Sequence, residues 1–211
     1  MLDKQSSHRA APASHGNGNG FAAPAVIVGV DDERGVHVAR TMARHGIETI
    51  AIAKDAKSVG TRTRTIGKRL VANTDTEDVI DKLVELGSTL PVPGVLFPCF
   101  DTVVSLISQH RDRLTGLYRI ALPCEETIAL IKDKARFYKF CQAHDYSVPR
   151  TVVLRKPEDV DIARQKLRFP CIIKPTDSKA PQWQAATRIK AFHAKDAAEL
   201  DELYERCLLY T

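Results

Sequence analysis

Two lysines lie where the local sequence is unfavourable for a positive charge, and they are the residues best suited to chemistry. Lys174 follows Ile173 and precedes Pro175, in a segment that predicts the end of a buried strand. Burying an ammonium group is costly unless an anion or a ligand receives it. Lys134 lies in the first turn of a helix that Asp133 is expected to cap, where the helix macrodipole disfavours a cation. We therefore expect both lysines to face one polyanion, with a nucleoside triphosphate as the candidate.

Three short motifs follow one another between positions 133 and 175. They are Asp133-Lys134, then Val-Pro-Arg-Thr at 148–151, then Phe-Pro-Cys-Ile-Ile-Lys-Pro at 169–175. In order and spacing they resemble the ATP-grasp superfamily, whose pattern is an Asp-Lys/Arg helix start, a Gly-Ile-x-Val-Pro-x-Thr strand entry and a Phe/Tyr-Pro-x-Ile-Ile/Val-Lys-Pro strand. The closer likeness is to carboxylate–amine ligases related to D-aspartate ligase and carbamoyl-phosphate synthase, and it runs from about Ala25 to the last residue.

This resemblance implies both a fold and an activity. The fold is α/β: a Rossmann-like, parallel-sheet pre-ATP-grasp lobe at residues 24–123, then an incomplete ATP-grasp α+β subdomain at residues 124–211. The activity uses ATP and Mg²⁺ to activate a small carboxylate as an acylphosphate, which an amine then attacks. In the family the magnesium-binding residues come later than position 211, so no metal ligand and no catalytic residue is assigned. We expect the chain alone to be inactive.

The resemblance also implies the ATP contacts. Lys134 and Lys174 match two basic residues that reach the ATP phosphates, and the second also approaches the adenine. A lysine ammonium is a compact point charge that suits phosphate. In the family the next loop is usually glycine-rich so that backbone amides cradle the anion, but residues 176–188 contain no glycine. Lys190 is among the cations that could supply charge instead. The alternatives are a surface lysine at 134 and a strand-end lysine at 174 whose ammonium reaches water.

A second candidate position follows the strand predicted at 95–97. Asp101 lies at the carboxyl end of this strand, where open parallel sheets bind ligands, so we predict a substrate contact. The alternative is that Asp101 only caps the following helix. The turn from Gly29 to Gly35 does not match a dinucleotide fingerprint, because the middle glycine is missing and three carboxylates would repel a pyrophosphate.

Hydrophobic periodicity predicts alternating strands and helices, which is typical of a parallel sheet with right-handed crossovers. In the first lobe the expected strands are 25–30, 48–53, 70–72, 95–97 and 119–121, and the expected helices are 36–45, 76–86 and 101–110. In the second part we expect strands at 151–154, 171–174 and 189–193, and helices at 125–131, 134–143, 157–167 and 196–208.

Positive charge is concentrated in one run. Six lysines and arginines against one aspartate give residues 54–69 a net charge of +5, which equals the excess of 31 Lys and Arg over 26 Asp and Glu in the whole chain. The run could be a solvated loop, a contact to a substrate or nucleotide anion, or a nucleic-acid surface. It has no aromatic residue for stacking, so we expect no nucleic acid as partner. A non-catalytic Rossmann-like module that binds a ligand or a partner remains an alternative for the whole chain.

The remaining composition is that of an ordinary globular protein. Hydrophobic residues make up 44% of the chain, and no apolar run is long enough for a membrane span. Residues 1–23 lack the apolar core of a secretory signal and are rich in Ser, Ala, Pro, Gly and Asn, so we expect a disordered tail. The five cysteines are scattered without a Cys-x-x-Cys pair, which favours free thiols and a cytoplasmic location. A homo-oligomer is left open.

Overall fold

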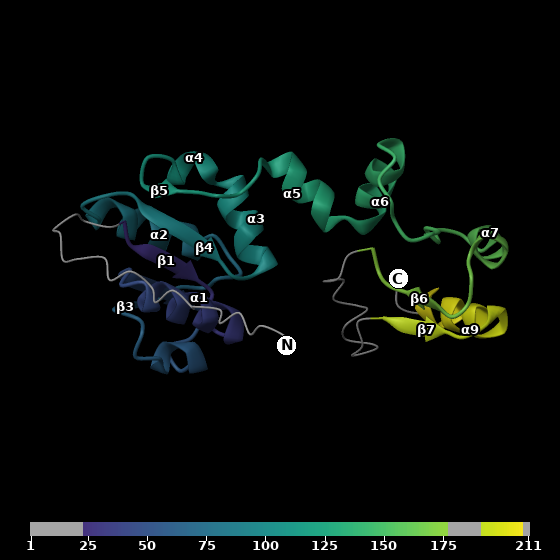
Figure 1. The fold of residues 1–211 in the computed structure, drawn as a ribbon, viewed down its shortest axis with the longest axis horizontal. Coiled ribbons are helices and arrows are strands. Elements are labelled where there is room, and N and C mark those ends of the chain that lie inside the picture. Colours follow the sequence, from purple (N-terminus) through teal and green to yellow (C-terminus); the bar gives the residue numbers. More distant parts are fainter. Residues whose placement is uncertain (1–22, 177–190, 209–211) are drawn as a thin grey trace, which may run out of the picture. The chain divides into compact units, whose positions relative to one another are not determined.

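The computed structural model describes residues 23–176 and 191–208, and these form two compact units (Figure 1). The first unit comprises the chain up to Val104 together with His110–Ala121, and the second comprises Ser105–Gln109 and the chain from Leu122 onward. The expected disordered tail lies outside the described residues except for Ala23. The domain limits 24–123 and 124–211 stay predictions.

The first unit alternates strands and helices. Its elements are β1 (Ala25–Val28), α1 (Glu33–Arg44), β2 (Thr49–Ala53), the 3₁₀ helix η1 (Val59–Arg62), β3 (Lys68–Val71), α2 (Asp78–Thr89), β4 (Gly94–Pro98), α3 (Asp101–Gln109), which continues into the second unit, α4 (Arg111–Leu114) and β5 (Tyr118–Arg119). The strands form one parallel sheet in the order β3-β2-β1-β4-β5. This confirms the α/β class and the parallel sheet predicted from the sequence.

The centre of this sheet is the core of the first unit. All four residues of β1 are buried because β2 and β4 flank the strand and helices cover the sheet. The crossover through α1 leads outward from β1 to β2, whereas the crossover through α2 leads back from β3 to β4. Since both are right-handed by rule, α1 and α2 lie on opposite faces. On the α2 side the Tyr118 hydroxyl donates to the Leu83 carbonyl oxygen at 2.6 Å.

The second unit is mainly helical, with one short pair of strands. Its elements are α5 (Glu125–Lys132), α6 (Lys134–Ala143), α7 (Glu158–Lys166), β6 (Cys171–Ile173), β7 (Phe192–Ala194) and α9 (Ala197–Leu208). β6 and β7 are antiparallel, and α7 and α9 supply much of the core that packs against them. The buried members of that core are Val160, Ala163, Phe192, Ala194, Leu200, Leu203 and Tyr204.

One expected element of the second unit is wrong. Residues 151–154 do not form a strand, because no described strand pairs with them. Val152 and Leu154 instead pack, partly buried, against the core between α7 and α9. Their apolar alternation therefore reflects contact with helices and not membership of a sheet, which periodicity alone cannot separate in so short a segment.

Candidate functional site

Lys134 is the first residue of α6, as the sequence predicts. The Asp133 carboxylate caps this helix by accepting hydrogen bonds from the backbone amides of Ala135 at 2.9 Å and Arg136 at 3.0 Å. The Lys134 side chain is exposed, and its Nζ donates to the backbone carbonyl oxygen of Thr176 at 3.2 Å. Two amides of the helix N-terminus are thus already occupied, and the exposed ammonium keeps donor capacity beyond its one bond to Thr176.

Lys174 lies one residue beyond β6, and its environment differs from the expectation. The sequence predicts a buried strand, but Ile172 is 54% exposed and Lys174 is exposed as well. In β6, Cys171 and Ile173 face the core, while Ile172 faces the other side of the sheet opposite His193. The prediction of a desolvated ammonium is therefore wrong: α7 and α9 supply the core on one face, and the described residues leave the other face open to water.

The structure brings the two lysine motifs together. The bond from Lys134 to Thr176 joins the start of α6 to the chain two residues after Lys174. We call Lys134, Lys174 and the Thr176 carbonyl group the two-lysine site. No carboxylate within the described ranges forms an ion pair with either lysine. Lys190 and most of the glycine-free loop lie outside the described residues.

One further residue on this face was missed by sequence reasoning. His193 is exposed and stands opposite Ile172 in the β6–β7 register. The face therefore presents an apolar side chain and an imidazole next to the strand end that carries Lys174. Only the register reveals this, because the sequence of one strand does not show which residue of its partner faces it. A surface that combines apolar and cationic groups suits a ligand with a flat ring and an anionic tail.

Asp101 belongs to a separate cluster in the first unit. It is the first residue of α3, where the chain leaves β4, and β1 and β4 are the neighbouring strands between which the sheet order reverses. The Arg34 guanidinium stacks on the Phe100 ring at 4.7 Å and binds the Asp32 carboxylate through Nε at 2.9 Å and Nη2 at 2.6 Å. The hydrogen bond to Arg34 lowers the pKa of Asp32, and the same bond raises the pKa of Arg34, to which the charge of Asp101 adds a smaller effect.

The glycines of this turn serve close packing. Gly29 has a φ of +96°, and a Cβ there would lie 2.3 Å from Cδ2 of Phe100. A Cβ on Gly35 would lie 2.3 Å from the carbonyl oxygen of Gly29. The two glycines therefore let α1 and Phe100 approach the end of β1.

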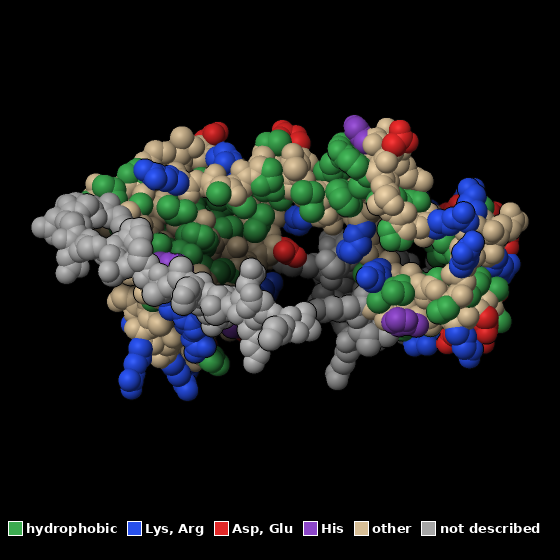
Figure 2. All heavy atoms as spheres, viewed as in Figure 1, with side chains coloured by type: hydrophobic (Ala, Val, Ile, Leu, Met, Phe, Trp, Pro, Cys, Tyr) green, Lys and Arg blue, Asp and Glu red, His purple; other side chains and the backbone are tan. Residues whose placement is uncertain are grey.

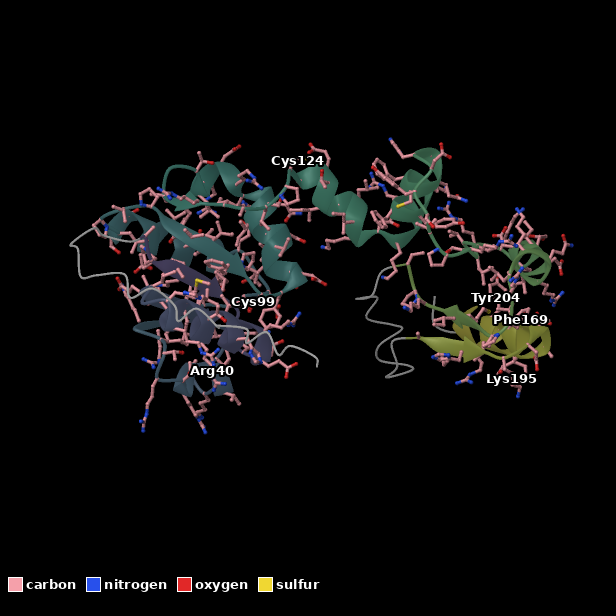
Figure 3. The ribbon with its side chains drawn as sticks, viewed as in Figure 1. Arg40, Cys99, Cys124, Phe169, Lys195 and Tyr204 are labelled. Atoms are coloured by element: carbon pink, nitrogen blue, oxygen red, sulfur yellow. The ribbon has the colours of Figure 1, made fainter. Side chains whose placement is uncertain are left out.

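Cys99, labelled in Figure 3, sits beside this cluster without the character of a nucleophile. Burial raises the pKa of its thiol from 9.0 to about 11, and the Asp32 carboxylate adds to the effect. Because of this raised pKa, the Cys99 thiol stays protonated in the folded protein at pH values where it would ionise in the unfolded chain. Any stability that this contributes is present below pH 9 and is lost as the pH rises towards 11.

Cys99 should therefore react slowly with iodoacetamide. At pH 9 only about one Cys99 thiol in a hundred is the reactive thiolate, and this thiol is partly buried. The Cys124 thiol, labelled in Figure 3, is exposed to the reagent. Mass spectrometry of the folded chain over time should show Cys124 alkylated at least tenfold faster, with buried Cys141 as a control for access. Equal labelling of Cys99 and Cys124 would contradict the burial of this thiol.

The architecture now defines a class. The first unit contains a doubly wound parallel sheet, and in the second unit the start of α6 is bonded to the chain just after β6. The sequence matches no family model and no curated protein. Solved structures, in contrast, match at probability 1.00.

Three of these structures illustrate the likeness. N5-carboxyaminoimidazole synthetase from Staphylococcus aureus has a TM-score of 0.64 and 16% identity, over 88% of this chain and 44% of its own. The biotin carboxylase domain of Hydrogenobacter thermophilus 2-oxoglutarate carboxylase is described as a dimer with MgADP and bicarbonate. It has a TM-score of 0.58 and 18% identity, over 86% of this chain and 40% of its own. L-amino acid ligase from Bacillus licheniformis has a TM-score of 0.56 and 14% identity, over 89% of this chain and 42% of its own. The chain thus shares the fold of the part of each structure that it covers, and it spans less than half of the length of each.

Neither a metal-ligand cluster nor a membrane-spanning helix is found in the part of the chain that the structure describes. Residues 23–176 and 191–208 contain no group of three or more His, Cys, Asp or Glu side chains that could hold a metal ion. The helices within these ranges are also too short or too polar to cross a membrane.

Proposed function

We propose that the chain binds ATP at the two-lysine site, as a protein of the ATP-grasp carboxylate–amine ligase type that acts through an acylphosphate. The observation that carries the proposal is the bond from Lys134 Nζ to the Thr176 carbonyl oxygen, which places Lys134 at the strand end of Lys174. Support for the nucleotide comes from the Hydrogenobacter thermophilus domain, which shares the fold and is described with MgADP and bicarbonate.

In this proposal the residues of the chain hold and orient the nucleotide. The Lys134 and Lys174 ammonium groups, which are exposed, bind phosphate oxygens as point charges. The open face of β6 and β7, with Ile172 and His193, takes the adenine side. In a ligase of this type Mg²⁺ neutralises charge on the phosphates, but the described residues offer no ligand cluster that fits it. We therefore assign nucleotide binding to these residues and no step of phosphoryl transfer.

Asp101 and the Arg34 cluster are proposed to contact the carboxylate or amine substrate. The support is their position at the carboxyl ends of β1 and β4, where the sheet order reverses and open α/β sheets bind ligands. The non-catalytic Rossmann-like module is less favoured, because the match to ligase structures covers 84–89% of the chain in several of them and so extends beyond the first unit.

Thermal unfolding with ATP and ADP tests the nucleotide site. At a hundredfold excess over its Kd, a ligand that binds only the folded state stabilises it by about 2.7 kcal/mol. We expect Lys174→Met to remove most of this stabilisation. Lys134→Gln should remove a comparable part, because Asp133 already occupies the amides of Ala135 and Arg136 that could otherwise compensate. Without nucleotide, both variants should unfold within about 0.5 kcal/mol of the parent, since both side chains are exposed.

Each variant has a matched control. Lys139→Gln changes an exposed lysine on the same helix, and Lys195→Met changes an exposed lysine at the opposite end of the β6–β7 pair, labelled in Figure 3. Both controls should keep the full nucleotide shift. If Lys134→Gln and Lys174→Met kept it as well, the two lysines would not bind phosphate and the proposal would be wrong.

A further inference from the structure

We propose that the basic segment between β2 and β3, together with the outer edge of β3, binds an extended acidic segment of a partner protein. We call residues 54–69 the basic crossover. This surface belongs to the first unit and is independent of the two-lysine site, so the two proposals can fail separately.

The first observation is that the crossover contains cations with no structural task. Two of the six cations do have a structural partner. Lys54 Nζ pairs with the Asp75 carboxylate at 2.5 Å. The Arg69 guanidinium donates to the carbonyl oxygens of Thr61 and Thr63, each at 2.7 Å. The others are exposed and form no ion pair with the described residues. They are Lys57, Arg62, Arg64 and Lys68.

The second observation is that the crossover is held in place. The Asp31 carboxylate accepts from the Ser58 hydroxyl at 2.6 Å and from the Lys54 amide at 2.9 Å. Further along, the Thr49 hydroxyl donates to the Thr65 carbonyl oxygen at 2.5 Å. These bonds, with those of Arg69, fix the segment from both ends, so its free cations are presented by a pre-organised backbone.

Exposed and half-buried residues alternate along positions 61–65 of the basic crossover. From 61 to 65 the three threonines are half-buried, while Arg62 and Arg64 between them are exposed. The Thr63 and Thr65 hydroxyls lie 3.2 Å apart on the protein side. Arg62 and Arg64 are therefore both exposed with one residue between them, and each guanidinium can bind a carboxylate of an acidic peptide.

The acidic groups of this region are already engaged. Asp31 holds Ser58 and Lys54, Asp75 pairs with Lys54, and the Asp55 carboxylate accepts from the Lys57 amide at 2.8 Å. None of the three approaches the free cations as an ion-pair partner. Figure 2 shows Lys and Arg side chains extending from the part of the first unit where β3 is labelled in Figure 1.

The third observation selects a polypeptide among polyanions. β3 pairs only with β2 within the described sheet, so its outer edge carries backbone groups that another strand can bond. Two apolar side chains of the region are also exposed: Val59, at the start of η1, is 77% exposed, and Val71, at the end of β3, is 48% exposed. A peptide can use edge amides, cations and apolar contacts together. Residues 54–71 contain no aromatic side chain on which single-stranded nucleic acid could stack, and they offer an anionic membrane only two exposed valines.

Fluorescence anisotropy with a short labelled peptide of alternating Glu and Val tests the proposal on the full chain. We expect saturable binding that weakens with salt, because surface ion pairs are screened. The double variant Arg62→Ser/Arg64→Ser should weaken it about tenfold. The control double variant Arg136→Ser/Lys139→Ser removes the same charge from exposed residues of α6 and should leave binding unchanged. Unfolding temperatures of all three proteins show that the variants are folded.

Further probes distinguish the partner classes. A peptide with the same charges but N-methylated backbone amides should bind at least several-fold more weakly, since it cannot donate to the β3 edge. Equal binding of the two peptides would overturn the strand-edge part. Binding of an oligodeoxythymidylate, or of phosphatidylserine vesicles, as tight as that of the Glu–Val peptide would overturn the polypeptide assignment. Self-association seen in analytical ultracentrifugation and lost in Arg62→Ser/Arg64→Ser would overturn the assignment to a partner protein. The basic crossover would then bind a second copy of this chain.

Discussion

Replacing Gly60 by alanine is expected to lower the free energy of unfolding of the first unit by about 3 kcal/mol. A Cβ at this position would lie 1.8 Å from the carbonyl oxygen of Val30, at the end of β1. The obstacle is backbone and cannot rotate away, so either η1 or the chain after β1 must shift. Urea unfolding, followed by far-UV circular dichroism, measures the change.

The control for this substitution is Gly116→Ala. Gly116 has a φ of +85°, and a Cβ added there would meet no atom within 4 Å, so alanine encounters only backbone strain of about 1 kcal/mol. A larger loss at Gly116 than at Gly60 would show that η1 is not packed against Val30. Because Gly60 lies within the basic crossover, a folded Gly60→Ala protein should also bind the Glu–Val peptide more weakly.

The substitutions Ile27→Ala and Ile172→Ala should differ strongly from each other in their effect on the free energy of unfolding. Ile27 in β1 is fully buried at the centre of the five-stranded sheet, and Ile27→Ala should cost about 3–4 kcal/mol through lost burial and a residual cavity. Ile172 in β6 is 54% exposed, and Ile172→Ala should change the free energy of unfolding by about 0.5 kcal/mol or less. Urea denaturation of both variants provides the comparison.

The Ile172 result also reports on the open face of β6 and β7. A loss above about 2 kcal/mol for Ile172→Ala would mean that other parts of the chain cover this face in solution. In that case the exposure of Lys174, on which its proposed role depends, would have to be revised. A small loss combined with weaker nucleotide stabilisation would support the adenine side of the proposed site.

The sheet of the first unit could be predicted because its strands carry unmistakable signals. Residues 25–28 and 49–53 are apolar runs of strand length separated by an amphipathic helix, and both are fully buried in the structure. The short strand β5 was expected one residue late, at 119–121, because its partner β4 sets its limits and its own two residues do not. The strand expected at 151–154 failed for the same reason, since a strand exists only where a neighbour supplies hydrogen bonds.

The candidate site was predictable only in part. The cap of Asp133 on α6 is a local interaction, and the sequence predicts it correctly. The environment of Lys174 depends on how many strands and helices surround β6, and the identical run of apolar residues would be buried in a wider sheet. The Lys134–Thr176 contact joins positions 42 residues apart and requires the fold. The roles of Lys134, Lys174, Lys190 and Asp101 stay predictions.

The open face of β6 and β7 also affects how a bound ligand would change amide exchange in these strands. A two-stranded sheet is marginally stable by itself, and elements with few covering contacts exchange their amide protons through local opening. We expect the amides of β6 and β7 to exchange faster than those of β1, which lies between two strands. A ligand held on that face would slow this exchange, and part of its binding free energy would be spent on ordering the strand pair. Its binding would therefore carry an unfavourable entropy of ordering.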